Sequence, residues 1–122
     1  MAKGGRRYLR VRRNLAQALG DRPVDHFCIA FEGGLHRSFT INPATFLRRE
    51  YALVASGGDV FVFRLKWPPI FSSRIQGLEE KIDRSTVRWT GKYLLSGGRE
   101  FSPLPSHEDD AISLAGRNDR ED

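Results

Sequence analysis

The residues best suited to acid–base chemistry or metal binding are one cysteine and three histidines, at positions 28, 26, 36 and 107. His26 and Cys28 are two residues apart, so on a β-strand their side chains would share one face, as a catalytic pair requires. Their neighbours are apolar, however, and a free cysteine is among the most buried residue types. We therefore expect Cys28 to be a buried structural residue. His107 precedes a run of acidic residues, and we expect it at a helix end rather than in a metal site.

The sequence shows none of the residue patterns that most often signal catalysis. It contains no His-Glu-x-x-His motif, no Walker-type loop and no Gly-x-Ser-x-Gly elbow. Glu79 and Glu80 are adjacent, so on a helix their carboxylates would diverge rather than meet at one reacting atom. The Gly-Gly pairs that begin at positions 33, 57 and 97 are typical of turns. We expect no enzyme activity, no bound metal and no cofactor.

Charge is distributed unevenly along the 122 residues. The chain has 20 Lys and Arg against 15 Asp and Glu, a formal charge of +5. The first 13 residues hold only cations, whereas acids dominate from position 107 onward, a pattern typical of interaction proteins. The alternative is that both ends are solvated or neutralise each other. The residues that we predict to meet an anionic partner are Lys3, Arg6, Arg7, Arg10, Arg12, Arg13, Arg64 and Lys66.

A second candidate for interaction is the apolar segment at 67–71, which follows two of these cations. It consists of Trp67, Pro68, Pro69, Ile70 and Phe71. The two prolines should end the preceding strand, because they offer no backbone N–H to a sheet. The segment is either a lid on the open end of a barrel or an exposed contact for a partner or a lipid surface.

The spacing of apolar residues predicts an amphipathic basic helix over 6–19. Tyr8, Val11, Leu15 and Leu19 fall on one face, and Gly20 supplies a stop. Because the segment is so cationic, we expect it to be an electrostatic contact element outside the core. Deleting residues 1–13 should then leave the melting temperature nearly unchanged.

Beyond position 23 the chain alternates short β-type segments with turns. Ile75, Leu78 and Ile82 have helical spacing after two serines, so we expect a short helix there. Ser106 and Asp109 resemble a capping box that begins a last helix, over 110–115. The predicted strands are 24–31, 35–41, 51–55, 59–67, 86–89, 92–95 and 99–104.

These elements predict a mainly β protein with terminal helices. The expected architecture is an antiparallel, bent sheet or partly open barrel of about seven strands, capped by the C-terminal helix. The expected divisions are a basic arm at 1–22, a β domain at 23–116 and a charged tail at 117–122. No apolar run is long enough to cross a membrane, so we expect a cytoplasmic protein, or one peripheral at the membrane.

The segment YALVASGGDVFVFR at 51–64 resembles the central hairpin of bacterial pleckstrin-homology-like (GRAM-like) small domains. The resemblance extends over roughly 24–115, where further strands and a closing helix follow. It implies a PH-like barrel and a binding scaffold rather than an enzyme.

We therefore expect a non-enzymatic binding or adaptor module that recognises a protein, a peptide or an anionic lipid surface. The first alternative is a small basic nucleic-acid-binding protein, whose aromatic residues would be Phe61, Phe63, Trp89 and Tyr93. The second is a structural subunit of a larger complex.

Overall fold

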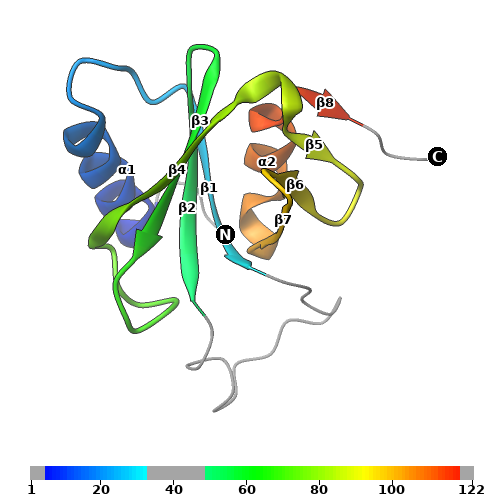
Figure 1. Ribbon diagram of the computed structural model, residues 1–122. Helices are drawn as coiled ribbons and strands as arrows, with labels where there is room; N and C mark the ends of the chain where they lie inside the picture. Colours follow the sequence, from blue (N-terminus) through cyan, green and yellow to red (C-terminus); the bar gives the residue numbers. More distant parts are fainter. Residues whose placement is uncertain (1–4, 33–48, 119–122) are drawn as a thin grey trace.

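The computed structural model describes residues 5–32 and 49–118, which form one open, strongly bent sheet with a helix on each face (Figure 1). The strand order is β4-β3-β2-β1-β7-β6-β5-β8, and every pair is antiparallel except β5 with β8. The mainly β fold with a C-terminal helix is thus confirmed. The elements are α1 (Arg6–Leu19), β1 (His26–Glu32), β2 (Glu50–Ser56), β3 (Asp59–Leu65), β4 (Ile75–Asp83), the 3-10 turn η2 (Arg84–Thr86), β5 (Arg88–Trp89), β6 (Leu94–Ser96), β7 (Arg99–Pro103), the 3-10 turn η3 (Pro105–His107), α2 (Glu108–Leu114) and β8 (Arg117–Asn118).

The hairpin of β2 and β3 forms the centre of the fold. Ser56 pairs with Asp59 across a two-residue turn, where Gly57 adopts a φ of 62° that favours glycine. Side chains then alternate between the two faces of the sheet. Val60 and Val62 belong to the cluster under α2, whereas Phe61 and its alternating neighbours belong to the cluster under α1. Because both faces are apolar, both need a cover.

The cover of one face is α1, and the expectation that this helix lies outside the core is wrong. Val11 and Leu15 are fully buried, and they pack with Phe27, Val54 and Phe61 of the sheet. The helix begins and ends as predicted, and Gly20 follows it with a φ of 67°. Burial of the apolar stripe outweighs the repulsion among the arginines, of which all but Arg7 are exposed. Deletion of residues 1–13 should therefore unfold the protein.

The opposite face packs against α2, and here the core contains the largest buried ring. Trp89 and Leu114 lie in this cluster together with Cys28, which is fully buried as predicted. His107 is the residue before α2, at a helix end as expected. The predicted capping box is not formed, since no side chain caps this helix and Ser106 lies in η3 instead.

The predicted helix at 75–82 is wrong, because this segment is strand β4. It pairs with β3 over its length, with register shifts between Val62 and Phe63 and between Arg64 and Leu65. Ile75 packs against the cluster under α1, whereas Ile82 packs against the cluster under α2. The two side chains lie on opposite faces of the sheet, as residues seven apart on a strand do, although the same spacing also looks helical in the sequence. Leu78 is left exposed.

The remaining strands differ from the predictions mainly at their ends. The predicted strand at 35–41 lies outside the described residues. The first two residues of the expected tail form β8, which pairs with β5, and the rest of that tail also lies outside the described residues. Within the described chain, no helix is both long and apolar enough to span a membrane.

Candidate functional site

The connection between β3 and β4 presents two large apolar side chains to solvent. The side chains of Trp67 and Phe71 are 70% and 65% exposed. The connection has a narrow neck, where the Lys66 N–H donates to the Arg74 carbonyl at 2.9 Å. Within it, the N–H of Ser72 donates to the Pro68 carbonyl at 3.0 Å. We call residues 66–74 the aromatic loop. The prediction of a lid over a barrel end does not fit these two exposed rings.

The aromatic loop is fixed to the sheet by a buried carboxylate. Glu50, 2% exposed at the start of β2, accepts a hydrogen bond from the Ile70 N–H at 3.0 Å and forms an ion pair with Arg7 of α1. Burial raises the pKa of Glu50, while the charge of Arg7 and the two hydrogen bonds oppose this rise. The carboxylate therefore joins three elements that are distant in sequence.

Helix α1 holds the loop at two further points. Arg7 donates from Nε and Nη2 to the Ser72 carbonyl, at 3.1 and 3.0 Å. Asn14 donates from Nδ2 to the Ser73 carbonyl at 2.7 Å. These contacts keep Ile70 at a φ of 64°, a left-handed conformation that costs a non-glycine residue about 1–2 kcal/mol. A strained residue held by its surroundings is typical of functional loops.

The predicted anion-binding arginines fall into two groups. Arg7 is 22% exposed and its guanidinium is engaged within the fold by Glu50 and the Ser72 carbonyl. Arg10 and Arg13 are exposed, and together with Arg74 they line a hollow of about 270 Å³ beside the loop. Arg74 was missed by the sequence analysis, because its place beside α1 depends on the tertiary fold.

The other predicted cations are less closely grouped. Arg6 and Arg12 are exposed on α1, and Lys66 is exposed at the loop neck. Arg64 is half-buried, with its Nη1 3.9 Å from the Glu79 carboxylate. Lys3 lies outside the described residues. Arg49 joins Lys66 and Trp67 around a second hollow, of only about 60 Å³.

The surface made by α1 and the aromatic loop is strongly cationic. The fourteen residues of α1 include five arginines, the loop adds Lys66 and Arg74, and neither segment contains an acid. The buried carboxylate beneath them is paired with Arg7. The exposed rings therefore stand beside several cations that have no acid within their own segments. We call α1 together with the aromatic loop the basic–aromatic surface.

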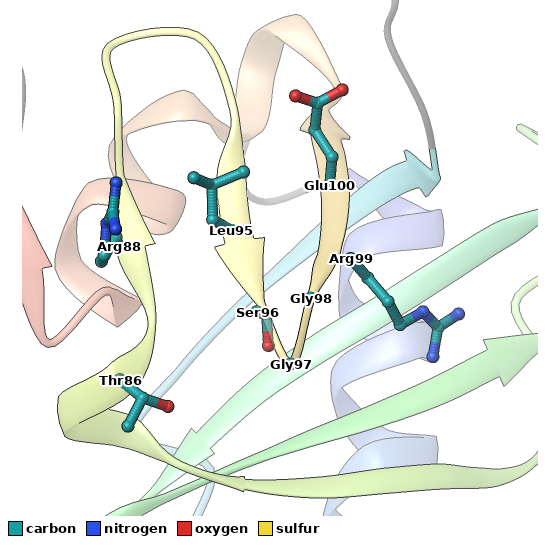
Figure 2. Close-up of a pocket in the computed structure, with 8 residues that line it drawn as sticks. All are labelled: Thr86, Arg88, Leu95, Ser96, Gly97, Gly98, Arg99 and Glu100. Carbon is teal, nitrogen blue, oxygen red and sulfur yellow. The ribbon is translucent and has the colours of Figure 1, made fainter.

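A larger hollow, of about 540 Å³, lies on the other half of the sheet (Figure 2). Its walls include Arg88, Leu95 and Glu100, which are opposite one another across β5, β6 and β7. The buried hydroxyl of Ser96 also lines it, and no base accepts a hydrogen bond from that hydroxyl among the described residues.

Arg99, at the rim of this hollow, extends towards the first half of the sheet (Figure 2). Its guanidinium contacts the carboxylates of Glu32, Glu79 and Glu80 at 2.9, 3.1 and 3.3 Å. It also lies 5.0 Å from the ring centres of Tyr51 and Phe101. The hydrogen bond with Glu32 is the main cause that raises the pKa of Arg99 and lowers that of Glu32. This cluster joins β4 to β7 and is structural.

The remaining chemical candidates lie in the core. Burial, and secondly the charge of Asp110, raise the pKa of the Cys28 thiol, so a reactive thiolate is disfavoured there. Among the described residues, no three His, Cys, Asp or Glu side chains are grouped to hold a metal ion. Phe61, Phe63 and Trp89, which nucleic-acid binding would need on the surface, are 7%, 4% and 1% exposed.

Comparisons of this chain with known protein families, with curated proteins and with solved structures found no match.

Proposed function

We propose that this chain is a non-enzymatic binding module of pleckstrin-homology-like type that recognises an anionic partner. The basic–aromatic surface is its binding site. The observation that carries the proposal is the fixed aromatic loop, which exposes Trp67 and Phe71 and whose Arg74 borders one hollow with Arg10 and Arg13 of α1.

The PH-like assignment rests on the resemblance of 51–64 and is supported by the architecture. A bent, mostly antiparallel sheet with a helix packed into its concave face is compatible with that class. Helix α1, which covers the outer face, is an addition that brings the cations to the aromatic loop. A fold of this kind serves many functions, so the proposal depends on the surface and not on the fold.

The nucleic-acid alternative receives less support. Three of the four aromatic residues that would stack on bases are buried in the two core clusters. The exposed cations would still attract a polyanion without reading its sequence. A nucleic acid therefore belongs among the probes.

The test measures binding of the full chain to three anionic probes: vesicles containing phosphatidylserine, a single-stranded oligonucleotide and polyglutamate. The wild type should bind at least one probe, more weakly as salt is added. The Arg10→Glu/Arg13→Glu variant should bind that probe at least about tenfold more weakly, since each cation at an anionic surface contributes about 1 kcal/mol.

The matched control reverses two exposed lysines elsewhere, in Lys81→Glu/Lys92→Glu. This variant has the same net charge as the arginine variant and should keep most of the binding. Equal losses in both variants would show that net charge, and not this surface, attracts the partner. Failure of the wild type to bind any of the three probes would refute the proposed function.

A further inference from the structure

The shape of the basic–aromatic surface indicates which anionic partner it suits. We propose that the partner is a lipid bilayer containing anionic lipids, with Trp67 and Phe71 entering the bilayer interface. Arg10, Arg13 and Arg74 would then meet headgroup phosphates. This inference rests on the proposed function and narrows it to one class of partner.

The aromatic loop is a projection and not a groove. Figure 1 shows the connection between β3 and β4 extending beyond the ends of both strands. The hollow next to Trp67, of about 60 Å³, is far below the roughly 300 Å³ of an ordinary ligand pocket. A protruding apolar loop suits a fluid partner whose molecules can surround the exposed rings. The interface of a bilayer is such a partner, and tryptophan is enriched there.

The loop is also fixed before any contact is made. Glu50 holds Ile70, and Arg7 and Asn14 hold the carbonyls of the two serines that follow Phe71. Binding therefore does not have to order the loop, and little conformational entropy is lost when the two rings enter the interface.

The cations lie where headgroups would meet them. Arg10 and Arg13 border the same hollow as Arg74, which closes the neck of the aromatic loop. Neither α1 nor the loop contains an acid that would repel an anionic lipid. Charge alone binds a membrane only weakly, and a second, apolar anchor makes the contact stable. The aromatic loop contains both parts itself, because Lys66 and Arg74 flank the segment with the two exposed rings.

The two tryptophans of the chain make the insertion measurable. Trp67 is 70% exposed, whereas Trp89 is 1% exposed in the core under α2. Vesicles of phosphatidylcholine and phosphatidylserine with brominated acyl chains should quench the fluorescence of Trp67 and not that of Trp89. In the Trp67→Phe variant, which contains Trp89 alone, the same vesicles should cause no quenching.

Affinity for the phosphatidylserine vesicles gives the second measurement. The Trp67→Ala variant should bind at least about tenfold more weakly, because a large apolar side chain no longer leaves water. The control is Leu78→Ala, which removes an apolar side chain that is 53% exposed on β4 and should bind as the wild type does. Vesicles of phosphatidylcholine alone should bind weakly.

Two outcomes would overturn this inference and leave the proposed function standing. One is binding to the anionic vesicles without quenching of Trp67, which would mean a purely electrostatic contact. The other is binding to the oligonucleotide or to polyglutamate but not to vesicles, which would mean that the partner is a nucleic acid or an acidic protein. Absence of binding to all three probes would refute both proposals.

Discussion

The two helices cover opposite faces of one sheet, yet their charges are arranged in opposite ways. Helix α2 starts with Glu108, Asp109 and Asp110, and Arg84 donates to the last carbonyls of the helix. Both features favour a helix, because its N-terminal end carries partial positive charge and its C-terminal end partial negative charge. Helix α1 has two arginines in its first turn and no acid there. Its charges oppose its own dipole.

The difference indicates that the charges of α2 serve the stability of the helix, whereas the exposed charges of α1 serve contacts at the surface. The acids of α2 and Arg84 stabilise that helix. Arg6, in the first turn of α1, by contrast opposes the dipole of its helix, and within the described chain it has no partner role in the fold comparable to that of Arg7 with Glu50. Residues that disagree with local structural preference are most often found at functional sites. The exposed cations of α1 are therefore explained by what they meet at the surface, while Arg7 and the apolar stripe are explained by the core.

The largest expected effect tests whether both helices belong to the core. Leu15 in α1 and Leu114 in α2 are fully buried, so Leu15→Ala and Leu114→Ala should each lower the free energy of unfolding by about 2–5 kcal/mol. Denaturant unfolding measures both values. An unchanged midpoint for Leu15→Ala would mean that α1 is an appendage after all.

The next effect concerns the buried ion pair between α1 and the sheet. Arg7→Met leaves the buried Glu50 carboxylate without its cationic partner and should cost about 1–3 kcal/mol at neutral pH, because a buried acceptor that loses its partner keeps its desolvation penalty. Chemical denaturation at neutral pH gives the value. The Asn14→Ala variant, which removes a loop contact but no charge, serves as a control with a smaller loss.

The loss of stability in the Arg7→Met variant should depend on pH. The pKa of Glu50 is raised in the folded protein, so its protonated form contributes stability that is present below the unfolded pKa of about 4.3 and is lost as the pH rises through the folded pKa. Arg7→Met raises that pKa further, so its deficit in stability should shrink as the pH falls. A deficit that is constant with pH would mean that Arg7 acts through packing alone.

A smaller effect is expected at the other helix. Arg84 donates to the carbonyls of Ser113 and Leu114 at 2.7 and 3.0 Å, and Arg84→Gln should cost about 1 kcal/mol. Thermal unfolding would detect this as a lower melting temperature. Lys81→Gln, which removes an exposed cation from β4, should leave the melting temperature unchanged.

The smallest effect has the opposite sign. Arg6→Glu places an acid at the first residue of α1 and should stabilise the protein by about 0.3–1 kcal/mol at low ionic strength. The same change should weaken binding to anionic vesicles. A variant that becomes both more stable and a weaker binder would separate the two requirements on α1, whereas a destabilised variant would contradict the comparison of the helices.

The parts of the fold that depend on local pattern could be predicted from the sequence. The bounds of α1 follow from an unbroken apolar stripe that ends at Gly20, and the hairpin around Gly57 follows from strict alternation. Strand β4 could not be recognised, because Ile75 and Ile82 are seven residues apart and face opposite sides of the sheet, so neither face shows a repeated apolar alternation. That spacing is consistent with a helix, and only the pairing with β3 reveals the strand.

The candidate site could be predicted only in part. The sequence identified the arginines of α1 and the apolar segment at 67–71, but not that the fold brings them together. Their contact depends on Glu50, a single acid that looks unremarkable beside Arg49 in the sequence. It also depends on Val11 and Leu15, whose burial sets the position of α1 on the sheet. Such long-range contacts leave no local signal.

The cluster around Arg99 forms a seam in the sheet, by which we mean a contact between β4 and β7 made by side-chain ion pairs rather than by strand pairing. In strand order β4 and β7 are the first and the fifth, so no backbone hydrogen bonds join them, and side-chain charges close the gap instead. Such a seam can part while every strand pairing is kept, and it weakens as salt screens the charges. Cys28 shares a cluster with Tyr51 and Phe101, the two rings under Arg99. We therefore expect a thiol reagent to label Cys28 faster as salt is added, well below the conditions that unfold the protein, because the sheet should open transiently between β4 and β7, where ion pairs rather than strand pairing hold it.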